Sequence, residues 1–331
     1  MKTELLLTAF VSSFILQNSA HAQGSLTPPV GAPAPVMKSL AQIEPRTPIS
    51  SVPFTITVPG SYYLATNVTT AVSNAIVIAA NGVTLDLNGF TIASAVTNAA
   101  SGGTAILLGS NLSGITIRNG HIRGGVTKGV TNYSGSGFAN GIYYVGASPN
   151  GVRASDISVS GCLSNGISLG TSSVVESCIV RTVGGGNNTV GIGAFTVKSC
   201  QAVDIGSGYA IVGGQISDSR GEVVFQGIGI DAETALNCQG TTYAASFGGG
   251  IAARTALNCT GTCAGDGFGI YARSAQNCSG ISFLGNGIQA YTASFCTGNA
   301  NAPGYAISAT VANGCIAEFG VNNIANKYNM P

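Results

Sequence analysis

The side chains best suited to chemistry lie in two columns of polar residues that flank a repeated isoleucine. If Ile230 and its equivalents, spaced about 19 residues apart, point inward on strands, the residues one and three positions later point outward. The two outward columns contain Asp231, Ala252, Tyr271, Gln289, Ser308 and Glu233, Arg254, Arg273, Tyr291, Thr310. Seven of these residues form a candidate ligand-binding face: Asp231, Glu233, Arg254, Tyr271, Arg273, Gln289 and Tyr291.

The carboxylates of Asp231 and Glu233 would lie roughly 6.5–7 Å apart if they are two positions apart on one strand. Such a pair could serve glycoside hydrolysis, or could help to hold Ca²⁺ beside an arginine base in a lyase reaction. Tyrosine and arginine faces suit sugar rings and uronate groups. The simpler alternative is an exposed sheet on which Glu233 pairs with Arg254 across neighbouring strands. Ca²⁺ is expected only for a lyase, and otherwise no cofactor and no metal is predicted.

Other catalytic signals are weak. His21 lies in a predicted leader, so His121 alone remains for a Ser-His-Asp triad, and no Gly-x-Ser-x-Gly motif accompanies it. We expect His121 to occupy a surface turn after Asn119-Gly120.

Cysteine recurs with the isoleucines, eight residues after each. The equivalent positions are Cys200, Ser219, Cys238, Cys259, Cys278, Cys296 and Cys315. This pattern favours buried free thiols that pack as small apolar groups; disulfides between coils, or a metal at Cys259 and Cys263, are the alternatives. Cys162 and Cys263 lie outside the register and are the candidates for reactive thiols. The total of nine leaves at least one cysteine unpaired within the chain.

The elements that must position these side chains follow from the repeat. The isoleucines are Ile192, Ile211, Ile230, Ile251, Ile270, Ile288 and Ile307, at intervals of 19, 19, 21, 19, 18 and 19 residues. One repeat cannot close a core alone, but stacked coils place identical positions about 4.8 Å apart. The sequence predicts an all-β fold, a single-stranded right-handed parallel β-helix solenoid with a short N-terminal cap. Strands ending at Asp86 and Arg118 precede similar Asn-Gly turns, so these two residues are expected to pair.

The remaining chain divides by composition. Residues 1–22 are expected to be a signal peptide, because an apolar run precedes Ala20-His21-Ala22. A proline-rich spacer is expected at 23–36, an N-terminal cap with a short amphipathic helix at 37–74, the β-helix at 75–320, and a C-terminal tail or cap at 321–331. The leader is typical of a bacterial Sec-type signal peptide and predicts a secreted or cell-surface protein.

Composition excludes several classes. Glycine numbers 48, charged residues make up 8%, and the mean hydropathy is +0.36, which excludes a disordered chain. The net charge of +1 offers no electrostatic reason to expect nucleic acid or an anionic membrane. No later stretch is long and apolar enough to predict a membrane span.

The segments Glu44–Ile49, Pro59–Leu64 and Gly82–Gly89, with the recurrent Gly-Ile and Asn-Cys-x-Gly units, resemble secreted bacterial right-handed parallel β-helix repeat proteins. These proteins belong to the pectin-lyase-like superfamily. The resemblance covers most of the mature chain and implies the fold, whereas the superfamily includes lyases, hydrolases, adhesins and spikes. The tandem Asp pairs and Gly-His-Gly motif of polygalacturonase-like hydrolases are absent from this sequence.

Three functions remain open. Regular repetition with few ionisable groups favours a non-enzymatic surface or matrix component that contacts extracellular polysaccharide. The second hypothesis is a polysaccharide lyase or other carbohydrate-active enzyme that uses Asp231, Glu233, Arg254 and Arg273. The third is a spike or fibre protein that self-associates through flat outer sheets.

Overall fold

The computed structural model describes residues 44–330 except 72–73, 98–102, 186–187 and 244–247. The predicted signal peptide, the spacer and the amphipathic helix therefore lie outside the described residues. The described part of the unit Arg46–Pro331 consists of strands, turns and bends, without a helix. Accordingly, no helix of the described residues could cross a membrane.

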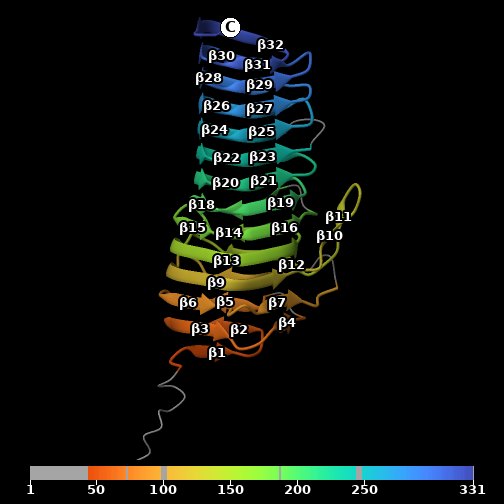
Figure 1. Cartoon of the computed structure of the whole chain (residues 1–331). Coiled ribbons are helices and arrows are strands. Elements are labelled where there is room, and N and C mark those ends of the chain that lie inside the picture. The colour runs from red at the N-terminus through yellow and green to blue at the C-terminus, as the bar shows by residue number, and fades with distance from the viewer. Residues whose placement is uncertain (1–43, 72–73, 98–102, 186–187, 244–247, 331) are drawn as a thin grey trace, which may run out of the picture. The chain divides into compact units, whose positions relative to one another are not determined.

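The strands form one coil after another from the N-terminal to the C-terminal end of this unit (Figure 1). The early strands are β1 (Thr47–Ile49), β2 (Phe54–Ile56), β3 (Gly60–Leu64), β4 (Val68–Thr70), β5 (Ile76–Ile78), β6 (Val83–Asp86), β7 (Thr91–Ser94), β8 (Gly103–Leu108) and β9 (Ser113–Arg123). The middle strands are β12 (Phe138–Tyr144), β13 (Asn150–Cys162), β14 (Asn165–Ser168), β15 (Ser173–Glu176), β16 (Ile179–Val183), β17 (Thr189–Gly193), β18 (Thr196–Lys198), β19 (Gln201–Ile205), β20 (Gly208–Ser217) and β21 (Arg220–Val223).

The late strands repeat in a strict alternation of a longer and a shorter strand. They are β22 (Gly227–Leu236), β23 (Gln239–Thr242), β24 (Gly249–Leu257), β25 (Thr260–Cys263), β26 (Phe268–Gln276), β27 (Ser279–Ser282), β28 (Ile288–Ser294), β29 (Thr297–Ala300), β30 (Tyr305–Asn313), β31 (Ile316–Phe319) and β32 (Val321–Tyr328). A separate antiparallel hairpin, β10 (Thr127–Lys128) and β11 (Tyr133–Ser134), projects from the side of the coils.

The parallel pairing confirms the predicted β-helix. It produces a β-solenoid of about 12 turns. Ile230 pairs with Ile211 on one side and with Ile251 on the other, and all three side chains are fully buried. The same pairing joins the seven isoleucines named above, which we call the Ile column. Strands of this sheet run from Thr47 to Tyr328, so they also occur in the ranges predicted as N-terminal cap and C-terminal tail.

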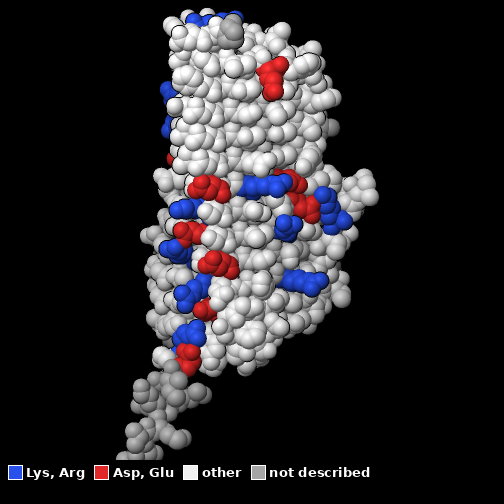
Figure 2. Space-filling view, in the orientation of Figure 1, with Lys and Arg blue, Asp and Glu red and all other residues white. Residues whose placement is uncertain are grey.

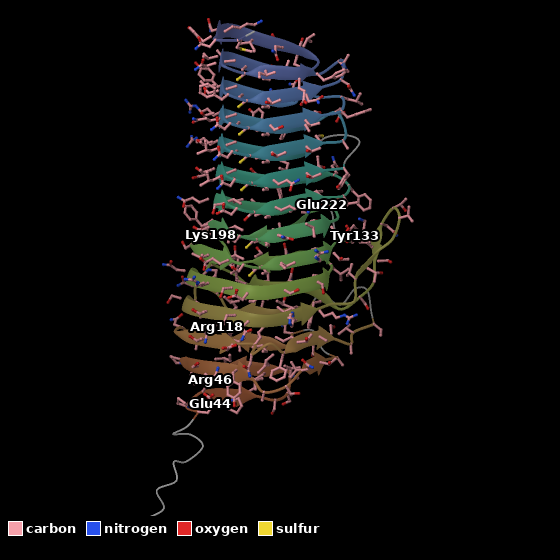
Figure 3. The ribbon with its side chains drawn as sticks, viewed as in Figure 1. Glu44, Arg46, Arg118, Tyr133, Lys198 and Glu222 are labelled. Carbon is pink, nitrogen blue, oxygen red and sulfur yellow. The ribbon has the colours of Figure 1, made fainter. Side chains whose placement is uncertain are left out.

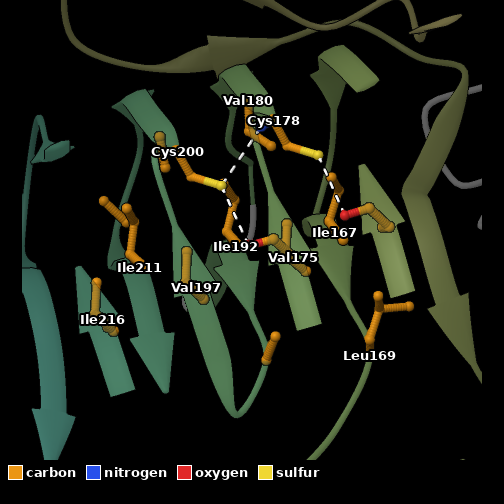
Figure 4. Close-up of a cluster of buried hydrophobic side chains, with 14 of the residues drawn as sticks. Ile167, Leu169, Val175, Cys178, Val180, Ile192, Val197, Cys200, Ile211 and Ile216 are labelled. Atoms are coloured by element: carbon orange, nitrogen blue, oxygen red, sulfur yellow. Dashed lines mark hydrogen bonds between the residues drawn. The ribbon is translucent and has the colours of Figure 1, made fainter. Parts of the chain in front are cut away.

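The nine cysteines are buried free thiols, as the repeat predicted. In the coils where cysteine follows the Ile column, each Sγ–H donates to the carbonyl two residues earlier, as Cys238 does to Leu236 at 3.2 Å. Ser219 replaces cysteine in one coil and makes the same bond to Ser217 at 2.7 Å. Figure 4 shows Cys178 and Cys200 packed among the buried apolar side chains of successive coils.

Burial contradicts the expectation that Cys162 and Cys263 are reactive. Their exposed fractions are 0% and 1%. Burial raises the pKa of Cys162 to about 12, which disfavours the nucleophilic thiolate.

The residue before each cysteine except Cys263 adopts a left-handed backbone conformation, which explains the Asn-Cys motif. Asn237, Asn258 and Asn277 have φ angles of 52°, 53° and 51°. Asparagine tolerates this region better than most residues. The amide Nδ2 of Asn258 donates to Oδ1 of Asn237 at 3.2 Å, and that of Asn277 donates to Asn258 at 3.3 Å. The turns therefore align from one coil to the next.

Charged side chains gather on the N-terminal coils, whereas the visible face of the C-terminal coils is almost free of charge (Figure 2). The predicted contact between Asp86 and Arg118 is confirmed as an ion pair of 3.2 Å. Arg46 contacts the same carboxylate at 3.5 Å, and Arg153 pairs with Glu176 on later coils.

Candidate functional site

Five of the seven predicted face residues line one groove across the late coils. We name it the arginine–tyrosine groove, and its volume is about 530 Å³. It is lined by Arg254, Tyr271, Arg273, Gln289 and Tyr291, together with Ala253, Ala272, Ala290 and Thr310.

The register of β24, β26 and β28 creates this hollow. Ala253, Ala272 and Ala290 pair in succession, so small side chains form its floor. The larger residues beside them stand outward on neighbouring strands, which places Arg254 and Arg273 about one coil, or ~4.8 Å, apart along the solenoid.

The aromatic side chains of the groove are open to solvent. Tyr271 is 50% exposed and Tyr291 is 59% exposed. The ring of Phe268 lies 5.6 Å from that of Tyr271 and supports it from one side. Two exposed ring faces and the amide of Gln289 can therefore contact a ligand in the groove.

The electrostatics of the groove are those of an anion site. Within the described residues, neither Arg254 nor Arg273 makes an ion pair, and no carboxylate lines the groove. Two like charges on adjacent strands disfavour each other, and a bound anion would relieve that repulsion. The arrangement favours a ligand that carries carboxylate or other anionic groups.

The predicted pair of Glu233 with Arg254 is not formed. Although the two residues occupy equivalent positions on β22 and β24, Glu233 lines a second groove toward the earlier coils. This phenylalanine groove has a volume of about 460 Å³. It is lined by Ser168, Gly170, Thr171, Gly193, Ala194, Phe195, Val212, Gly213, Gly214 and Glu233.

Asp231 lies beside the two grooves and lines neither of them. It pairs in register with Val212 and Ala252 and is half-buried. Burial raises the pKa of its carboxyl group above the ordinary value. The structure thus places Asp231 and Glu233 on the predicted face but outside the arginine–tyrosine groove.

No metal site is recognisable in the part of the chain that the structure describes. It contains no group of three or more His, Cys, Asp or Glu side chains able to hold a metal ion. The thiol of Cys259 donates to the carbonyl of Leu257 at 3.2 Å, whereas the thiol of Cys263 donates to the carbonyl of Gly248 at 3.7 Å. His121 is exposed and lies within β9, opposite Thr91 of β7. The prediction that it occupies a turn after Asn119-Gly120 is therefore wrong.

Sequence reasoning missed a polar cluster under the hairpin β10–β11. The hydroxyl of Tyr133 donates to the carbonyl oxygen of Asp204 at 2.9 Å, and Lys128 pairs with the Asp204 carboxylate at 2.6 Å. Burial, together with Asp204, raises the pKa of Tyr133. Figure 3 shows Tyr133 on the side of the coils where the hairpin projects. These contacts hold the hairpin against later coils; no repeat in the sequence indicates them.

Comparisons with known proteins found similarity in structure but not in sequence. No family model and no curated protein sequence matches the chain. The A-module of the mannuronan C-5 epimerase AlgE4 of Azotobacter vinelandii is 12% identical, with a TM-score of 0.44, over 82% of this chain and 89% of that one. The catalytic domain of a GH87 α-1,3-glucanase in complex with nigerose is also 12% identical, with a TM-score of 0.44, over 86% of this chain and 61% of that one. The proposals that follow depend on this chain's own residues.

Proposed function

We propose that this protein binds an acidic polysaccharide outside the cell through the arginine–tyrosine groove. The observation that carries the proposal is the pair Arg254 and Arg273, which face an open groove without a carboxylate partner among the described residues. Guanidinium groups bind carboxylates in a two-pronged geometry, which suits the uronate units of an acidic glycan.

The tyrosines support the same ligand class. A pyranose ring has one apolar face and a rim of hydroxyl groups, so it can pack on Tyr271 or Tyr291 while its hydroxyls reach Gln289. A groove open on the surface also allows a long chain to enter from the side and to extend past both ends.

Binding, rather than turnover, is the function that this groove supports best. Glycoside hydrolysis needs two carboxyl groups that flank the scissile bond. The carboxylates predicted for that role, Asp231 and Glu233, do not line the groove. The lyase hypothesis stays open as an alternative, to be decided by an assay for unsaturated uronate products.

The test is calorimetric titration with galacturonic acid oligomers. We expect Arg254→Ala and Arg273→Ala each to weaken binding about tenfold, because each removes a charged hydrogen bond that contributes about 1.4 kcal/mol or more. Binding should also weaken as salt is added, since exposed charges are screened.

The matched control is Arg153→Ala, which removes an exposed arginine that is already paired with Glu176. Its affinity should equal that of the wild type. Unchanged binding in both groove variants, or equal affinity for neutral glucose oligomers, would exclude the proposed function. If the protein releases unsaturated uronate products and Asp231→Ala abolishes their release, the function is lyase activity and not binding alone.

A further inference from the structure

The phenylalanine groove contains an aromatic ring whose position is tightly determined. Phe195 lies between β17 and β18, and its carbonyl accepts hydrogen bonds from the N–H groups of Gly214 at 2.9 Å and Gln215 at 2.7 Å. Its ring lies over Gly214, where any Cβ atom would overlap the ring. Glycine at this position therefore allows the ring to lie against the sheet.

Much of this ring remains available to a ligand. Phe195 is 40% exposed. Val212, Gly213 and Gly214 form the apolar side of the groove. Ser168 and Thr171 add hydroxyl-bearing side chains to the lining.

Glu233 supplies the one charged side chain of the groove lining. It stands one coil after Gly214 on the same outward column and is exposed. Within the described residues it makes no ion pair, even though Arg254 occupies the next position of that column. An unpaired carboxylate beside an exposed aromatic ring adds no stability to the fold, but it presents two groups that attract the same kind of ligand.

The surroundings reinforce the negative character of this groove. No lysine or arginine lines it. Asp231 lies two positions before Glu233 and opposite Val212, so a second carboxyl group lies near the groove lining. The carboxylate of Glu233 and the face of the Phe195 ring both attract a cation.

We propose that the phenylalanine groove binds the protonated amino group of an amino sugar, which pairs with Glu233 and packs against the ring of Phe195. The site goes beyond the function proposed above, because its charge preference is opposite to that of the arginine–tyrosine groove. The two grooves begin one coil apart at Glu233 and Arg254. A glycan that carries both amino and carboxylate groups could therefore occupy both.

The experiment is calorimetric titration with a glucosamine tetramer in mildly acidic buffer, where its amines are protonated. The N-acetylglucosamine tetramer, which has the same length without the charge, is the comparison ligand. We expect Glu233→Gln to weaken glucosamine binding about tenfold and Phe195→Leu to weaken it about threefold, because leucine keeps the apolar bulk but removes the ring. Glu318→Gln, an exposed carboxylate on a distant strand, is the control and should leave binding unchanged.

Two results would overturn the proposal: equal affinity for the acetylated tetramer, or unchanged glucosamine binding in Glu233→Gln. Circular dichroism melting of each variant verifies that it is folded. Galacturonic acid oligomers distinguish the two proposals, because Glu233→Gln should leave their binding unchanged or tighter. Loss of glucosamine binding in Glu233→Gln upholds this site even if the arginine variants bind uronates normally.

Discussion

At the scale of single residues, Asp231 is the carboxylate whose surroundings differ most from water on the candidate face. It is half-buried beside Val212 and makes no hydrogen bond or ion pair with the described part of the chain. Burial disfavours its charged form, which raises its pKa. The ionised form of Asp231 is therefore unfavourable in the folded state.

The pH dependence of stability tests this cost. Because the pKa of Asp231 is higher in the folded protein, its stabilising effect is complete below the unfolded pKa and is lost as pH rises through the folded pKa. Asp231→Asn stays neutral throughout, so we expect its free energy of unfolding to exceed that of the wild type at neutral pH. The excess should disappear below about pH 4. Urea unfolding at several pH values measures it; an excess independent of pH would show that the charge is not the cause.

At the scale of elements, the late coils are thin because glycines of facing strands approach each other directly. Gly261 of β25 lies against Gly269 of β26, and a Cβ atom at Gly261 would overlap the carbonyl oxygen of Gly269. It would also lie 2.6 Å from Cγ1 of Ile270, a member of the Ile column. Gly240 and Gly280 repeat this contact against Gly250 and Gly287, while a Cβ atom at Gly298 would overlap the carbonyl oxygen of Ala306.

We expect Gly261→Ala to lower the free energy of unfolding by about 3 kcal/mol or more, because backbone atoms cannot yield to the added methyl group. Gly109→Ala is the matched control, since its Cβ atom would meet its nearest neighbour at an ordinary 3.4 Å. Chemical denaturation of both variants measures the difference. A loss in Gly261→Ala no larger than in the control would mean that the strands separate easily.

At the scale of the whole molecule, one strand places a polar residue in the Ile column. Asn322 of β32 pairs with Ile307 of β30 and so takes the place of an isoleucine. Among the described residues, its Oδ1 atom is a buried side-chain atom without a hydrogen-bond partner. Self-association as a spike or fibre stays a prediction that light scattering can test.

Asn322→Ile should raise the free energy of unfolding by about 1–2 kcal/mol, because it removes an unsatisfied polar group and extends the Ile column. Asn323→Ile, which changes the adjacent exposed residue, is the control and should alter stability by less than about 0.5 kcal/mol. Hydrogen exchange of the β32 amides locates the effect. Equal gains in both variants would indicate general hydrophobicity rather than the inward position of Asn322.

The repeat by itself determined the fold and the contents of the outward columns. Strand side chains alternate, and one coil cannot bury its own core, so identical isoleucines had to stack and Arg254, Arg273 and Tyr291 had to face outward. The free thiols followed from the same register. The contact of Asp86 with Arg118 came from a second, shorter similarity between two early strands.

Only the tertiary structure decided which side chains share a groove. Phe195 stands three residues after Ile192, at the same repeated outward position as Gly214 and Glu233, but the repeat does not show that its ring covers Gly214 where the chain bends between β17 and β18. That geometry places Glu233 with Phe195 and leaves Arg254 to the arginine–tyrosine groove. A column in the sequence specifies neighbours along the solenoid, whereas the direction of a long side chain depends on the space that surrounding coils leave open.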